Sequence, residues 1–221
     1  MTDYLLKIMS SGRWKTYDRL SQQTGLPADV LYQRNLTYSK ELYVILAGME
    51  VVVRNAFHEE LKTYFRQEDW MSNINLFRKS HKSQLDKAID KLAQNKSGGY
   101  SIPDLIAELN FGFWAHLTDA PYEQVFWTPA LRHAFPAKFG KPVRQDIEQR
   151  LKSLLHMRNK IAHLEPIVRY EPQLRQVYQN AYDIISWICP DTAKWFDCVN
   201  NFKEIWATNT GGTNASKDLK K

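Results

Sequence analysis

Apolar residues recur along most of the chain at the three- and four-residue spacing of an amphipathic helix. The longest such stretch runs from Asp29 to about Arg66, and its length predicts a break near Leu36–Ser39. Glu50 precedes Arg54 by four residues in this stretch, a spacing that allows a structural salt bridge along one helix face. The apolar positions of the stretch are Leu31, Leu42, Ile45, Leu46, Met49, Val52, Val53, Phe57, Leu61, Tyr64 and Phe65.

The same spacing predicts helices along the rest of the chain. Ser101 followed by Pro103 is typical of a helix start, after a glycine-bearing loop at 95–101. Pro166 is expected to stop the helix that contains the most basic part of the chain. The other helices are expected at 79–96, at about 143–163, at 172–188 and at 190–206. The fold class is therefore all-α, as one domain over residues 1–206 with a polar, disordered tail at 207–221.

Residues 104–135 are dense in aromatic side chains. Three roles remain open for this stretch: packing in the core, a platform on which nucleic-acid bases stack, or an exposed interface for a protein partner. Core packing is the simplest of the three. The aromatic residues are Phe111, Phe113, Trp114, Tyr122, Phe126, Trp127 and Phe135.

Composition narrows the class of protein. The 221 residues are 43% hydrophobic and 13% aromatic, which excludes disorder for most of the chain. The longest uncharged apolar runs are shorter than a membrane span, and residues 1–15 lack the pattern of a cleaved export signal. The two cysteines, Cys189 and Cys198, form no CxxC motif. A reducing, cytoplasmic location is expected.

The positive charge is concentrated in one segment. Residues 131–175 contain ten Lys and Arg against four Asp and Glu, an excess that equals the net charge of +6 of the whole chain. One interpretation is a solvated helix face, and the other is a surface that binds a polyanion such as RNA or DNA.

Candidate chemistry lies in the same segment. On a helix, Asn159 and His163 are about 40° apart, His156 shares their face, and the long side chain of Arg158 reaches its flank. An arginine binds a phosphodiester through its planar fork, and a histidine can exchange a proton with a ribose hydroxyl or a leaving oxygen. The alternative is a histidine that only caps or packs the helix end.

The positions of the two histidines bear on metal binding and on the number of proton-transfer groups. His156 and His163 are about 10 Å apart along the helix, too far to share one metal ion, so neither a metal nor another cofactor is expected. Acid–base cleavage of RNA uses two proton-transfer groups, whereas the patch offers one well-placed histidine, His163. A two-fold dimer would supply the second from its partner, and His156 of the same chain is the weaker alternative.

The segment RNKIAHLEP resembles the Arg–(four to six residues)–His motif of the HEPN superfamily, in the form found in Abi-like (abortive infection) proteins. Three other segments resemble the same family: GMEVVVRNAFHEEL at 48–61, DLIAELNFGFWAHL at 104–117 and VFWTPALRHAFP at 125–136. The resemblance covers residues 20–190. Leu164 departs from it, because a second histidine often occupies that position in the family.

The resemblance implies a HEPN-type helical bundle, with additional N-terminal and central helices in this chain, which forms a homodimer. It implies a metal-independent endoribonuclease of a toxin or phage-defence system, which leaves 2′,3′-cyclic phosphate ends and is restrained by a protein or RNA antitoxin. Arg158, Asn159 and His163 match the catalytic motif. Arg54 and Asn55 form a second Arg–Asn pair, whereas His58 lies at the wrong spacing for the motif and is interpreted as structural or supporting.

The remaining site residues are expected around this motif. Arg144, Arg150, Lys152 and Lys160 are expected to bind RNA, and His156 and Glu165, together with Arg54 and Asn55, to support the site. A non-catalytic RNA-binding or regulatory module is the alternative function, since the superfamily also contains members that only bind.

Overall fold

A computed structural model of the chain describes residues 10–96 and 98–210, and within these ranges it contains helices, turns and loops but no strand. The prediction of an all-α fold is therefore confirmed. The principal helices are α2 (Ser11–Thr24), α3 (Ala28–Phe65), α4 (Lys79–Asn95), α5 (Ile102–Glu108), α6 (Phe111–His116), α7 (Arg144–Ala162), α8 (Glu171–Ile188), α9 (Pro190–Val199) and α10 (Phe202–Asn209). Short 3₁₀ or π turns link them at Trp70–Ser72, Ile74–Leu76, Ala120–Tyr122, Glu123–Trp127, Leu131–Ala134 and Ile167–Tyr170.

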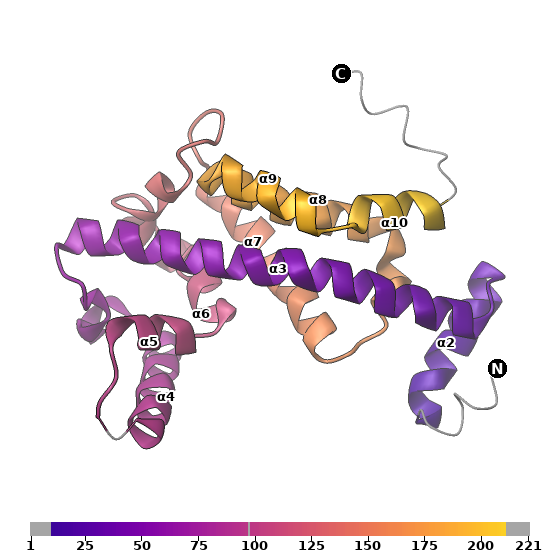
Figure 1. The fold of residues 1–221 in the computed structure, drawn as a ribbon. Coiled ribbons are helices and arrows are strands. Elements are labelled where there is room, and N and C mark those ends of the chain that lie inside the picture. The colour runs from indigo at the N-terminus through magenta and orange to yellow at the C-terminus, as the bar shows by residue number, and fades with distance from the viewer. Residues whose placement is uncertain (1–9, 97, 211–221) are drawn as a thin grey trace.

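Helix α3 is the axis of the molecule (Figure 1). Its 38 residues run without a break for about 57 Å. Helices α8, α9 and α10 lie along one side, α4 and α5 lie beside its C-terminal half, and α2 packs at its N-terminal end. Most other helices therefore bury their apolar faces against α3 or against a helix that packs on it.

The predicted break near Leu36–Ser39 is wrong, because the polar residues in that region are satisfied within the helix or by its neighbours. Asn35 is buried, and its side chain accepts a hydrogen bond from the backbone N–H of Val168 at 3.1 Å. The hydroxyl of Thr37 donates to the carbonyl of Gln33 at 2.9 Å. Helix α3 is thus supported along its whole length by tertiary packing.

The predicted helix 190–206 is two helices, α9 and α10. Asn200 ends the first, because its buried side chain donates to the carbonyl of Glu41 at 2.7 Å and accepts from the N–H of Phe202 at 2.9 Å. Asn201 also donates its N–H to the Glu41 carboxylate. The predicted tail begins too early, since α10 continues to Asn209, and residues 211–221 of that tail lie outside the described residues.

The start of α5 is as predicted. Ser101 caps the helix and forms a capping box with Asp104, and Pro103 lies in the first turn. Lys96 pairs with Asp104 at 2.5 Å, and its hydrogen bond and those of Ser101 hold the pKa of Asp104 well below its usual range.

The aromatic stretch is core. All seven of its aromatic residues are buried, and Phe113, Trp114 and Phe126 are fully inaccessible. Their rings contact one another and those of Trp70 and Phe77. The interpretations of this stretch as a base-stacking platform or as an exposed protein interface are therefore wrong.

In the part of the chain that the structure describes, none of the helices has the length and apolar character needed to cross a membrane.

Candidate functional site

The candidate site lies on α7, which has one buried and one open face. The buried face consists of Ile147, Leu151, Leu154, Met157 and Ile161. His156, Asn159 and His163 are all exposed. The core-facing residues therefore fix the orientation of the helix, and this orientation leaves the three polar side chains open to a ligand.

The C-terminal end of α7 is closed by a Schellman motif. The N–H of Leu164 donates to Ile161 at 3.0 Å and the N–H of Glu165 donates to Lys160 at 2.9 Å. Lys160 and Glu165 also form an ion pair at 2.8 Å, which raises the pKa of the lysine. His163 occupies the C-cap position, but among the described residues its imidazole has no hydrogen bond or ion pair. Only the backbone of His163 therefore serves the helix end.

Arg158 projects from the flank of α7 towards α3. Its Nε lies 3.3 Å from an Oε of Glu50, a carboxylate that is 16% exposed. The predicted pair of Glu50 with Arg54 is wrong, because Glu50 binds the arginine of another helix rather than the one a turn away on its own. This contact fixes one edge of the Arg158 guanidinium, and the side chain remains 34% exposed.

Arg158 and Asn159 line a pocket of about 300 Å³, here called the Arg158 pocket. Its other walls come from Leu155 of α7 and from the start of α6, at Asn110, Phe111 and Gly112. The two walls approach closely, since a Cβ on Gly112 would lie 3.8 Å from Cδ2 of Leu155. The structure thus brings Arg158 and Asn159 together at one cavity, whereas His156 and His163 do not line it.

The four basic residues expected to bind RNA are all in ion pairs. Arg144 is 7% exposed, donates to Glu123 at 3.0 Å and to the Thr118 carbonyl at 2.8 Å, and pairs with Glu148. The prediction that Arg144 contacts RNA is therefore wrong, because its guanidinium is enclosed by partners in the interior. Arg144 has a structural role, because its hydrogen bonds link α7 to the segment that follows α6.

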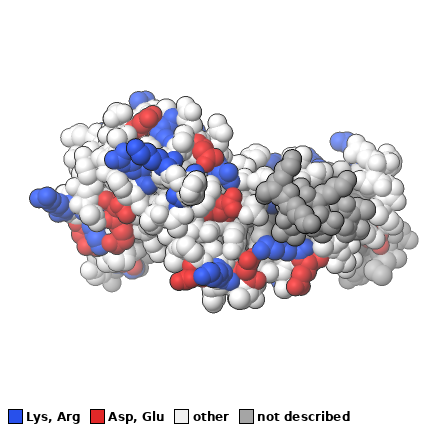
Figure 2. All heavy atoms as spheres, turned by 90° about the horizontal axis from the view of Figure 1, so that it is seen from above, with Lys and Arg blue, Asp and Glu red and all other residues white. Residues whose placement is uncertain are grey.

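Arg150 and Lys152 are less buried but are also paired. Arg150 contacts Asp146 at 3.0 Å and Asp183 at 3.3 Å. Lys152 contacts Glu148 at 2.6 Å and Asp119 at 3.0 Å, and hydrogen bonds to these carboxylates raise its pKa. Several of these carboxylates come from outside residues 131–175, so the local charge count overstates the positive field. On the face seen in Figure 2, basic and acidic side chains are interspersed.

Basic side chains without a carboxylate partner remain in this segment. Among the described residues, Arg132, Lys141, Arg169 and Arg175 are exposed and form no ion pair, and Arg132 donates a hydrogen bond to His133 at 3.2 Å. They are the side chains of residues 131–175 whose charge is most open to a polyanion.

Arg54, Asn55 and His58 lie together at a second cavity of about 320 Å³, here called the Arg54 pocket. Its other lining residues are Glu59, Glu68, Pro103 and Ile106. His58 is 4% exposed, and its Nδ1 accepts a hydrogen bond from the indole N–H of Trp70 at 3.2 Å. Burial lowers the pKa of His58. Spacing in the sequence separated His58 from the Arg–Asn pair, but one helical turn places all three at the same pocket.

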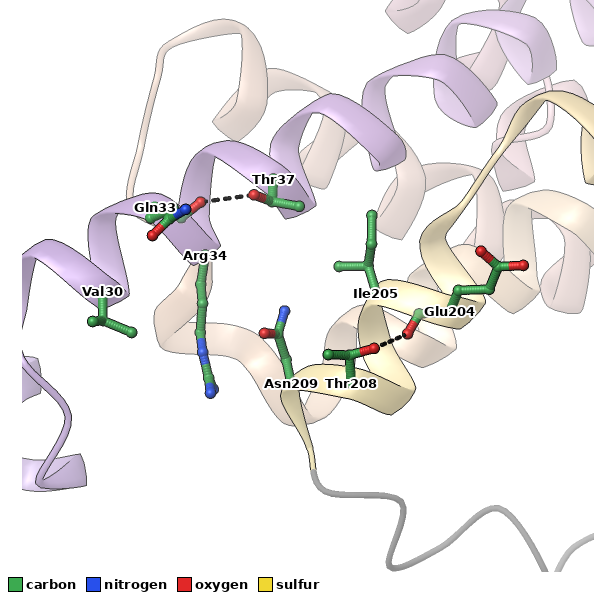
Figure 3. A pocket seen from close by; sticks show the side chains of 8 residues that line it. All are labelled: Val30, Gln33, Arg34, Thr37, Glu204, Ile205, Thr208 and Asn209. Carbon is green, nitrogen blue, oxygen red and sulfur yellow. Dashed lines mark hydrogen bonds between the residues drawn. The ribbon is translucent and has the colours of Figure 1, made fainter.

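A larger pocket, of about 480 Å³, lies between the N-terminal half of α3 and α10 (Figure 3). Its arginine, Arg34, is already engaged with Glu171 at 3.4 Å. The hydroxyls of Thr37 and Thr208 donate to carbonyls of their own helices. Because its polar groups are largely satisfied and it holds no histidine, cysteine or serine, this pocket offers little chemistry.

Reasoning from the sequence missed Glu50 as the partner of Arg158, and Asn110 and Gly112 as the facing wall of the Arg158 pocket. Segments 48–61 and 104–117, which already stand out in the sequence, contain all three, and this is the signal that could have found them. No protein-family model, no curated protein and no solved structure matches the chain.

Proposed function

We propose that the protein is a metal-independent endoribonuclease of the HEPN type, in which Arg158 binds the scissile phosphodiester and His163 transfers protons. The observation that carries this proposal is the placing of Arg158. Glu50 holds its Nε at the wall of a pocket, and among the described residues the rest of the guanidinium has no partner. An arginine anchored at one edge is preorganised to bind a phosphate with the other.

The reaction would proceed by attack of a ribose 2′-hydroxyl on the adjacent phosphorus. A bond forms between the 2′-oxygen and phosphorus while the bond from phosphorus to the 5′-oxygen breaks. A base takes the 2′-hydroxyl proton and an acid gives a proton to the leaving 5′-oxygen, so the products are a 2′,3′-cyclic phosphate and a 5′-hydroxyl. Arg158 stabilises the charge that develops on the phosphate oxygens.

A second chain supplies the second proton-transfer group in this proposal. The exposed face of α7 carries His156, Asn159 and His163 with unengaged side chains, so an isologous contact would bring two Arg158–His163 sets together. In abortive infection or a toxin system, an antitoxin of protein or RNA would restrain the activity. Expression is then expected to halt growth, and His163→Ala to relieve the arrest.

The test is cleavage of RNA by the purified protein in EDTA. His163→Ala is expected to lower the rate about 10²- to 10⁴-fold, because it removes a general acid–base group, and Arg158→Ala about 10²- to 10³-fold. His133→Ala, which removes an exposed histidine outside the site, is the matched control and should retain full activity. Equal activity in wild type, Arg158→Ala and His163→Ala would reject the assignment of the site.

The dimer is tested in the same assay by dilution. If the second proton-transfer group comes from a partner, activity per mole of chain falls as the protein is diluted through its dimer dissociation constant. His156→Ala then keeps most of the activity. A rate per chain independent of concentration, together with a large loss in His156→Ala, would assign the second group to His156 instead.

The second candidate function is a non-catalytic RNA-binding module. It is favoured by one observation: Arg158 lines its pocket and His163 of the same chain does not. This module would bind RNA in a salt-sensitive manner without cleaving it, and His163→Ala would leave the affinity unchanged.

A further inference from the structure

The Arg54 pocket contains a buried cationic N–H without an acceptor. Among the described residues, two buried side-chain nitrogens lack a hydrogen-bond partner, Arg54 Nε and Trp114 Nε1. The indole of Trp114 is neutral and enclosed in the core, whereas Arg54 is charged and lines a cavity. Leaving a charged donor without a hydrogen-bond acceptor is unfavourable, so a ligand oxygen that accepts from Arg54 would remove this cost.

His58 presents a second donor to the same cavity. The indole N–H of Trp70 can only donate, so the lone pair of His58 Nδ1 accepts it, and the neutral ring carries its proton on Nε2. His58 follows Arg54 by four residues on α3, which puts both side chains on one face. The histidine therefore has a fixed tautomer, with its N–H donor on Nε2. This nitrogen lies 4.0 Å from Glu68 Oε1, which is beyond hydrogen-bond distance.

The rim of the pocket limits the charge of the ligand. Glu59 and Glu68 line it with side chains that are 60% and 62% exposed, and Glu59 is also paired with Lys62 at 2.8 Å. Two carboxylates at the mouth repel a phosphomonoester, which carries a charge of about −1.5 to −2 at neutral pH. A phosphodiester has a single charge and meets about half to two-thirds of that repulsion. Pro103 and Ile106 provide an apolar wall beside it.

We propose that the Arg54 pocket binds a phosphodiester of the RNA strand, with the guanidinium of Arg54 and the Nε2–H of His58 as donors. The inference rests on the proposed function, since it names where the substrate continues beyond the Arg158 pocket. Glu50, which holds Arg158, lies one turn before Arg54, about 6 Å along α3. The walls of the two pockets also follow each other in the chain, at Pro103–Ile106 and Asn110–Gly112.

Binding of a 2′-O-methyl oligoribonucleotide tests the inference, because this probe keeps the phosphodiesters and lacks the 2′-hydroxyl needed for cleavage. Arg54→Gln is expected to raise its dissociation constant about tenfold to a hundredfold, the effect of one charge-assisted contact. Arg19→Gln removes the same charge from an exposed site on α2 and should leave binding unchanged. The indole ¹⁵N–H signal of Trp70 should move when the probe binds the wild-type protein.

Unchanged affinity in Arg54→Gln, or a Trp70 signal that stays in place at saturation, would overturn the inference. Arg54→Lys keeps the charge without the planar fork, and it serves if Arg54→Gln fails to fold; it should weaken binding several-fold. A nucleoside monophosphate distinguishes the source of the phosphate. It should bind less tightly than the oligomer, and equal affinity would contradict recognition of a diester.

The outcomes for the pocket and for the nuclease are separable. Binding that depends on Arg54, in a protein that cleaves no RNA, would retain the pocket and reject the nuclease. Cleavage that depends on Arg158, with probe binding indifferent to Arg54→Gln, would retain the nuclease and reject the pocket.

Discussion

At the scale of single residues, Leu164 is the unusual feature of the candidate site. Its φ of 55° is in the left-handed region, which is unfavourable by about 1–2 kcal/mol for a residue with a Cβ. The Schellman motif requires this conformation to end α7 directly after His163. The backbone is therefore strained at the residue that directly follows the candidate catalytic histidine.

Leu164→Gly is expected to stabilise the protein by about 0.5–1 kcal/mol. Glycine adopts the left-handed conformation without strain, although its greater freedom in the unfolded chain offsets part of the gain. The leucine side chain is 63% exposed, so little packing is lost. The measurement is the free energy of unfolding in urea, with Leu164→Ala as the control that removes the side chain and keeps the Cβ. A glycine variant no more stable than the alanine variant would show that φ is not the cause.

At the scale of elements, the packing of α9 against the long helix α3 requires a close approach at Gly48. Gly48 faces Phe196 of α9, and a Cβ at this position would lie 1.9 Å from the phenyl ring. Glycine is a weak helix former, so the missing side chain is explained by packing: it lets α9 lie directly against α3.

Gly48→Ala is expected to lower the free energy of unfolding by about 1–2 kcal/mol, because overpacking outweighs the better helix propensity of alanine. Phe196→Leu should recover part of that loss in the double variant, since the smaller side chain makes room for the methyl group. Urea denaturation of the two single variants and the double variant measures both effects. A Gly48→Ala protein as stable as wild type would mean that α9 shifts without loss of packing.

Helical periodicity predicted most elements of this fold, because most helices bury one apolar face. It placed α4, α7 and α8 to within a few residues, and the cap at Ser101 gave the start of α5. It failed where the backbone conformation depends on a contact with a residue distant in the sequence. Asn200, which separates α9 from α10, does so through Glu41, far away in the sequence. The same reason explains the site: Arg158 and Asn159 stand out as a motif, whereas Glu50 becomes their neighbour only after folding.

At the scale of the whole molecule, two imidazoles are kept in the interior. His81 accepts a hydrogen bond from Tyr122 at Nδ1 and donates from Nε2 to the Phe113 carbonyl at 3.2 Å, and His58 packs against Trp70. Burial lowers the pKa of both from the ordinary value of 6.5. Each therefore stays neutral in the folded protein at pH values at which it is protonated in the unfolded chain.

The stability of the protein is expected to fall as the pH drops below 6.5. Above that pH the two histidines are neutral in both the folded and the unfolded state, so they do not change stability. Below it, only the unfolded chain takes up the protons, and the free energy of unfolding falls by about 1.4 kcal/mol per pH unit for each histidine at most. Urea midpoints between pH 7.5 and 5 measure the decline. His81→Gln should flatten it, and His133→Gln, at an exposed position, should not. The same slope in His81→Gln and wild type would contradict this origin.

Glu50, Arg54 and His58 occupy successive turns of α3, so their spacing is a matter of length as well as of residue type. Each residue inserted or deleted between them would turn everything beyond it by about 100° and carry His58 or Glu50 away from its pocket. The surface loop at 136–142 is under no such restriction. Homologues of this protein are therefore expected to vary in length at that loop, and to keep residues 50–58 free of insertions and deletions even where the side chains differ.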